Sequence, residues 1–106
     1  MLINATVLIP QLKASPARPE EWPYIHNRAC AIFGGCTWGS TVLGGWVPPG
    51  SDDPMTEPMI PLSIAIDTLG DLALVVAFAR EIGEYLGEQE MFVSVGPFSE
   101  SVKVGG

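Results

Sequence analysis

Alternating apolar and polar positions predict four β-strands, with a short fifth strand or tail near the C-terminus. They cover residues 2–9, 37–46, 59–67, 91–95 and 98–104. One apolar face of the first strand carries Ile3, Ala5, Val7 and Ile9, and one of the third carries Ile60, Leu62, Ile64 and Ile66. Pro61 cannot donate to a strand ladder, so it indicates an edge or a bulge. The glycine-rich segment 37–46 is expected to be bent.

Apolar residues at helical spacing predict two helices, over residues 20–33 and 68–86. Gly34 and Gly87 follow them, as expected where a helix ends on a residue with positive φ. The second helix opens on Thr68–Asp71, which has the polar-x-x-acid form of a capping box. The residues expected to pack on the sheet are Trp22, Ile25, Phe33, Leu72, Val76 and Leu86.

The order of these elements predicts an α+β fold of the ferredoxin-like, split βαββαβ type. Both helices would cover one face of an antiparallel sheet. The length of 106 residues suits a single domain over residues 1–106. Residues 13–19 are rich in Pro, Ala and Ser and indicate a linker. Four prolines within residues 47–58 predict a mobile loop.

Acidic residues outnumber basic ones by 12 to 5, which gives a net charge of −7. The charge is uneven, with +1 over residues 1–50 and −8 over residues 51–106. Such a chain repels phosphate backbones, so we expect no direct nucleic-acid partner, while a basic protein remains an open alternative. Because no stretch reaches the roughly 18 apolar residues of a membrane span, and the N-terminus does not resemble a signal peptide, we expect a cytoplasmic protein without membrane contact.

Three short motifs, FGG-x-T, G-x-W and GQE, resemble the layout of a group of small uncharacterised bacterial and phage proteins. The matching residues are Phe33, Gly34, Gly35 and Thr37, then Gly44, Gly45 and Trp46, then Gly87, Gln89 and Glu90. The chain departs from this layout by carrying Glu88 between Gly87 and Gln89. The resemblance implies the ferredoxin-like fold and brings no established activity, so it carries over no catalytic residue.

The soft metal-ligand types of the chain lie close together in sequence. His26 and Cys30 share one helix face at i and i+4, and Cys36 follows just past the helix end. Zinc would need a fourth ligand, such as an acid from residues 52–57, and the spacing matches no standard zinc pattern. A Cys–His nucleophile would lack an orienting partner. We therefore expect a half-buried histidine and two apolar thiols, with no metal and no cofactor. A small enzyme using His26, Cys30 and Cys36 remains an alternative.

The sheet face opposite the helices is the candidate binding surface, because a two-layer domain leaves it uncovered. Either a second subunit covers this face, or Trp38 and Trp46 fold over it and make a shallow pocket. The candidate ligand or interface residues are Trp38, Trp46, Arg28, Thr6, Ser63, Phe92 and Ser94.

These features favour a non-enzymatic binding or interaction module, homo-oligomeric through its open sheet face. One alternative is a phage-type accessory protein that acts as an acidic inhibitor of a nucleic-acid enzyme. Another is a protein that sequesters a small ligand, such as a nucleotide signal, in a pocket made by Trp38, Trp46 and Arg28.

Overall fold

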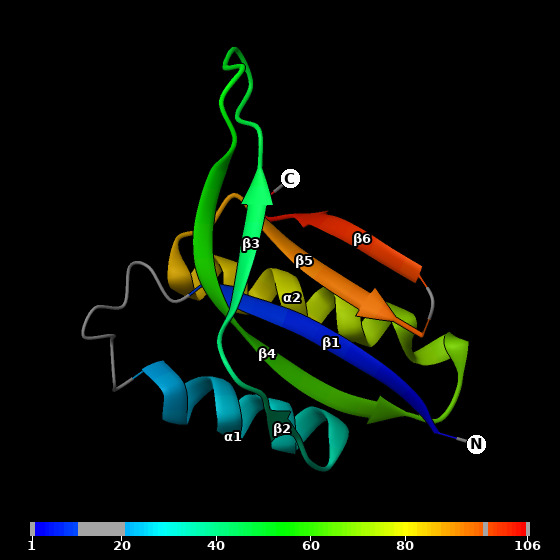
Figure 1. Cartoon of the computed structure of the whole chain (residues 1–106). Helices are drawn as coiled ribbons and strands as arrows, with labels where there is room; N and C mark the ends of the chain where they lie inside the picture. The colour runs from blue at the N-terminus through cyan, green and yellow to red at the C-terminus, as the bar shows by residue number, and fades with distance from the viewer. Residues whose placement is uncertain (1, 11–20, 97, 106) are drawn as a thin grey trace.

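A computed structural model describes residues 2–10, 21–96 and 98–105 of the chain. Two helices lie on one face of a six-stranded antiparallel sheet (Figure 1). The elements are β1 (Ile3–Pro10), α1 (Glu21–Phe33), β2 (Thr37–Trp38), β3 (Val42–Trp46), β4 (Met55–Ile66), the 3₁₀ turn η1 (Leu69–Asp71), α2 (Leu72–Leu86), β5 (Glu90–Val95) and β6 (Phe98–Lys103). The predicted linker over residues 13–19 lies outside the described residues.

The strands are ordered β2–β4–β1–β5–β6, with β3 also pairing with β4. Every neighbouring pair is antiparallel, and β1 lies between β4 and β5. The two central strands are therefore the first and third of the predicted pattern, as in a ferredoxin-like sheet. The predicted α+β fold is confirmed, and β6 extends it at one edge.

The core lies between the helices and the apolar side of β1, where Ala5, Val7 and Ile9 are almost fully buried. The predicted alternation is correct for β1 and for β4. The buried stripe of α2 agrees with the prediction at Leu86 and differs near the start of the helix, because Val75 and Phe78 face the core while Leu72 keeps 36% of its surface exposed. The Phe78 ring meets the Phe33 ring edge to face, with centroids 5.5 Å apart, and so joins the two helices.

Both predicted helix ends are confirmed. Gly34 has φ 85° and Gly87 has φ 74°, a region where a Cβ would be strained. The N–H of Gly87 donates to Glu84 O at 3.2 Å, which satisfies a carbonyl of the last turn. The predicted capping box is wrong, because Asp71 stands at the N-cap of α2 without a side-chain hydrogen bond. Instead, its N–H donates to Thr68 O at 3.1 Å within the 3₁₀ turn.

The predicted single strand over residues 37–46 is interrupted. In the ladder with β4, Trp38 of β2 pairs with Leu62 and Val42 of β3 pairs with Met59. The three residues between Trp38 and Val42 therefore lie opposite only two residues of β4. This extra residue makes a bulge beside Pro61, whose carbonyl accepts the N–H of Gly39 at 2.8 Å. Because one added residue exchanges the two faces of a strand, Trp38 and Trp46 lie on opposite sides of the sheet.

The predicted loop over residues 47–58 is shorter than expected, because β4 already begins at Met55. β3, residues 47–54 and the start of β4 form a hairpin arm that projects beyond the sheet (Figure 1). Among the described residues, no helix combines the length and the apolar character that crossing a bilayer requires.

Candidate functional site on the open face of the sheet

A groove of about 230 Å³ runs between the hairpin arm and the far half of the sheet. We call it the arm groove. It is lined by Leu8, Gly44, Gly45, Trp46, Glu57, Met59, Phe92, Val93, Ser94 and Ser99. Trp46 and Phe92 supply the aromatic walls, and each keeps 39% of its surface exposed. Five strands thus contribute to one cavity with aromatic walls and a few polar groups, the usual composition of a small-molecule site.

The backbone register explains how these residues meet. Gly44 lies opposite Glu57 in the β3–β4 ladder, and Phe92 lies opposite Leu8 in the β1–β5 ladder. Met59 is 4% exposed although it belongs to the open face, because the arm covers it. A Cβ on Gly44 would lie 2.7 Å from Met59 Sδ. Glycine at this position therefore allows the Met59 thioether to pack directly against the backbone of the arm.

Negative charge collects beside the arm groove. A neighbouring hollow of about 370 Å³ shares Trp46, Glu57 and Phe92 with it. The hollow is further lined by Pro49, Gly87, Glu88, Gln89 and Glu90. Glu90 Oε2 accepts the Ser101 hydroxyl at 3.1 Å, which orients that carboxylate on the open face. Aromatic surface bordered by carboxylates favours a cationic ligand with an aromatic group.

Three of the predicted site residues line the arm groove, namely Trp46, Phe92 and Ser94. Thr6 and Ser63 share the open face and are hydrogen-bonded to each other at 3.3 Å, but they do not line the groove. The sequence interpretation placed Glu57 in an acidic loop and did not select Met59 or Ser99. The alternation of Met55, Glu57 and Met59 was the available signal, and Pro54 and Pro58 concealed it.

The alternative in which Trp38 folds over the open face is wrong. Trp38 shares the helix side of the sheet with Leu62, and its ring lies against Trp22 with centroids 4.7 Å apart. Arg28 is also absent from the arm groove. Its guanidinium makes a two-pronged ion pair with Glu81 of α2, with N–O distances of 2.6 and 2.8 Å. The predicted pocket of Trp38, Trp46 and Arg28 therefore does not form.

The Arg28–Glu81 pair predicts a pH-dependent contribution to stability. The hydrogen bonds from Arg28 hold the pKa of Glu81 below its usual range, and the Tyr24 hydroxyl adds a third at 3.1 Å. A lowered native pKa stabilises the fold above the unfolded-state pKa, and this stabilisation is lost as pH falls through the native value. Glu81→Gln should therefore destabilise the protein slightly at pH 7 and leave it unchanged at strongly acidic pH.

Urea unfolding at both pH values measures this effect. Glu84→Gln, on the same helix, controls for the loss of one negative charge. If Glu81→Gln changed the free energy of unfolding equally at both pH values, the Arg28–Glu81 pair would not be the source of a pH-dependent contribution to stability.

The chain's one histidine and its two cysteines meet at the end of α1, on the other side of the sheet from the arm groove. Cys36 Sγ lies 3.4 Å from His26 Nδ1, Cys30 Sγ lies 3.7 Å from Nε2, and the sulfurs are 3.9 Å apart. Burial raises the pKa of the Cys36 thiol to about 11, with Cys30 adding to the shift. Trp38 Nε1–H donates to His26 Nδ1 at 3.1 Å, so the ring has the partner that sequence analysis did not find.

No protein family and no curated protein matches the chain. Two solved structures do match it in fold. A phage SAM lyase in complex with S-methyl-5′-thioadenosine aligns over 97% of this chain and 90% of its own, with a TM-score of 0.68 and 13% identity. A phage SAM lyase in the apo state aligns over 98% and 90%, with a TM-score of 0.64 and 14% identity. The chain thus shares the fold of a small phage protein.

These matches contradict the expectation of a non-enzymatic binding module, because both structures are of enzymes over almost the whole length of this chain. The same finding counts against the inhibitor and sequestration alternatives. The expected homo-oligomer and the resemblance carried by the FGG-x-T, G-x-W and GQE motifs stay predictions.

Proposed function

We propose that this protein is an enzyme that acts on S-adenosylmethionine (SAM), with the arm groove as its substrate site. The observation that carries the proposal is the pairing of two exposed aromatic rings, Trp46 and Phe92, with Glu57 in one cavity of the fold that phage SAM lyases share. The proposal includes a cytoplasmic location for the protein.

The chemistry of SAM suits the groove. Its sulfonium is a permanent cation, which aromatic faces and carboxylates attract. Its adenine has a flat face that stacks on Trp or Phe. Glu57 in the groove and Glu88 and Glu90 beside it supply negative charge for the sulfonium and the substrate's ammonium. The net charge of −7 draws a cationic substrate from solution.

The reaction follows from comparing SAM with S-methyl-5′-thioadenosine, which lacks the amino acid chain. Releasing that chain breaks the bond between sulfur and its γ-carbon, and the bonding electron pair passes to sulfur, which becomes a neutral thioether. A lyase adds no water, so the bond that the γ-carbon loses is replaced by a new bond within the substrate. Either the substrate's carboxylate oxygen bonds to the γ-carbon and closes a lactone ring, or the β-carbon loses a proton to a base and a double bond forms between the β- and γ-carbons. The walls formed by Trp46 and Phe92 would exclude water from this step.

Incubation of the purified protein with SAM tests the proposal. We expect S-methyl-5′-thioadenosine to accumulate in proportion to enzyme concentration, as measured by liquid chromatography with mass detection. The mass of the second product early in the time course separates a lactone or unsaturated acid from a hydrolysis product. Protein that binds S-methyl-5′-thioadenosine but forms none from SAM would overturn the proposed activity.

Variants connect this activity to the groove. Glu57→Gln should raise KM about tenfold, because one charge-assisted contact with the cation is lost. Glu100→Gln is the matched control, since Glu100 points to the other face of β6. Equal KM values for the two variants would remove Glu57 from the site.

A further inference from the structure

The end of α1 carries a cluster of metal-ligand side chains that lies apart from the arm groove. One donor atom each from His26, Cys30 and Cys36 lies within 4.8 Å of the others. Cys30 is in the last turn of α1, and Cys36 directly precedes β2. Both sulfurs are partly buried, while His26 is exposed. The whole chain contains two cysteines and one histidine, so every residue of these types is at this place.

Two of the donor–donor distances are near those around a single tetrahedral ion. Zinc binds thiolate at about 2.3 Å and imidazole at about 2.0–2.1 Å, which places neighbouring donor atoms roughly 3.5–3.8 Å apart. The two sulfurs are 3.9 Å apart, and Cys36 Sγ lies 3.4 Å from His26 Nδ1, whereas Cys30 Sγ lies 3.7 Å from the other ring nitrogen, Nε2. Binding of one ion through a single ring nitrogen would therefore require the imidazole and one of the thiols to move closer together.

The hydrogen bond from Trp38 identifies the nitrogen available to an ion. An indole N–H can only donate, so His26 Nδ1, its acceptor at 3.1 Å, carries a lone pair. Cys36 Sγ lies 3.4 Å from that same nitrogen. An ion placed there would take over the lone pair and release the Trp38 N–H.

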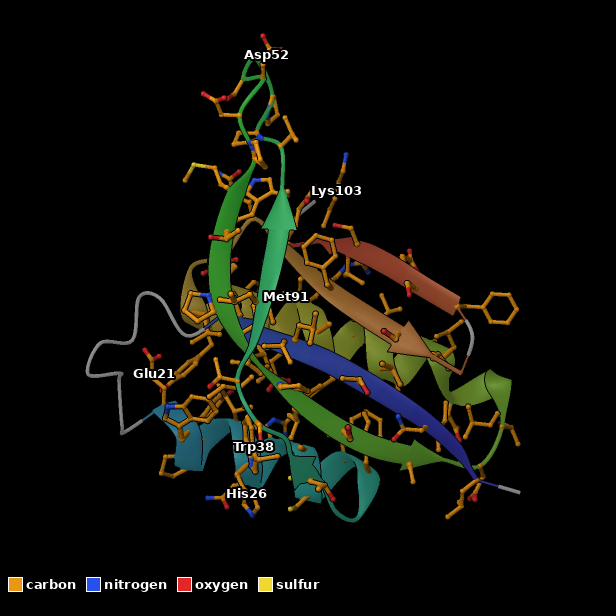
Figure 2. All side chains as sticks on the ribbon, viewed as in Figure 1. Glu21, His26, Trp38, Asp52, Met91 and Lys103 are labelled. Atoms are coloured by element: carbon orange, nitrogen blue, oxygen red, sulfur yellow. The ribbon has the colours of Figure 1, made fainter. Side chains whose placement is uncertain are left out.

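The fourth ligand cannot come from the acidic loop that sequence analysis considered. Asp52 is at the tip of the hairpin arm, and His26 is at the opposite end of the molecule (Figure 2). Three protein donors leave one position of a tetrahedral ion for solvent or an added ligand. The exposed side of His26 borders a wide hollow lined by Trp22, Pro23, Trp38, Gly39 and Ile60.

We propose that Cys30, Cys36 and His26 Nδ1 form a three-ligand site for a thiophilic divalent cation of the Zn²⁺ type. Two thiolates and an imidazole are the donor set that this class of ion prefers. A bound ion would tie the end of α1 to β2 across the Gly34–Gly35 turn.

The experiment is a titration of reduced, metal-free protein with Co²⁺, an optical probe for Zn²⁺ sites. We expect a thiolate-to-cobalt absorption band that saturates at one ion per chain and disappears when Zn²⁺ is added. Because the chain has no other cysteine, the band can only report Cys30 and Cys36. Native mass spectrometry with Zn²⁺ gives the stoichiometry, and the melting temperature should rise with Zn²⁺ concentration.

Variants define the ligand set. Cys30→Ser, Cys36→Ser and His26→Gln should each weaken Co²⁺ binding by more than about 100-fold, beyond the cost of losing an outer hydrogen-bond partner. Asp52→Asn should bind like the wild type. Melting curves without metal show that each variant is folded. Trp38→Phe removes the competing N–H donor, so it should bind Co²⁺ as tightly as the wild type or more tightly.

Two outcomes would overturn the proposal. One is the absence of a saturable thiolate band in the folded wild type. The other is wild-type affinity in either cysteine variant. Neither result bears on SAM cleavage, because the cluster lies on the other side of the sheet from Glu57 and Trp46.

Discussion

Trp46→Ala is expected to lower kcat/KM for SAM cleavage by about 10- to 100-fold. Stacking of a base on an aromatic side chain contributes about 1–3 kcal/mol, and each 1.4 kcal/mol corresponds to a factor of ten. Trp46 forms one wall of the arm groove opposite β5, and it also borders the acidic hollow beside it. Its removal therefore opens the site to water and takes away the largest flat surface near the carboxylates.

The matched control is Leu43→Ala in the same strand. Leu43 keeps 76% of its surface exposed and points to the face of β3 opposite Trp46. Both variants lose a large, partly exposed apolar side chain from β3, so they share any general effect on the arm. Initial rates over a range of SAM concentrations separate kcat from KM. If Leu43→Ala and Trp46→Ala had the same kcat/KM, the tryptophan would have no role at the substrate.

The contrast between Trp38 and Trp46 shows what limits prediction of the site. Eight positions separate them, so an uninterrupted strand would place both side chains on one face. The single extra residue between β2 and β3 reverses this relation. The glycines of this segment indicated a bend, but no local pattern locates a bulge that depends on pairing with β4. The arm groove could not be predicted for the same reason.

The ferredoxin-like fold, by contrast, was predictable because β1 and β4 alternate cleanly. Ala5 and Val7 are fully buried, whereas Asn4 on the other face is exposed. Which side of α2 faces the core was harder to predict. Its first half, Leu72–Ala79, is apolar at every position, so several stripes match a helical period equally well. Only the packing against Phe33 and the sheet selects Val75 and Phe78 as the buried side.

Phe78→Ala is therefore expected to destabilise the protein by about 3–5 kcal/mol, the usual cost of truncating a buried phenylalanine. Phe78 is 1% exposed, and its ring packs edge to face on Phe33 of α1. The truncation leaves a cavity where both helices meet the sheet and removes the ring contact with Phe33, one of the contacts between α1 and α2. Since the free energy of unfolding of a small domain is only about 5–15 kcal/mol, this one change removes a large part of it.

Phe98→Ala gives a matched control, because the same atoms are removed from a side chain that is 67% exposed. It should change the free energy of unfolding by no more than about 0.5 kcal/mol. Urea unfolding measures both variants, and a lower midpoint at an unchanged m-value identifies a loss of native stability. Equal midpoints for Phe78→Ala and Phe98→Ala would contradict the assigned core. A midpoint shift confined to Phe78→Ala would confirm that the buried side of α2 holds the two helices on the sheet.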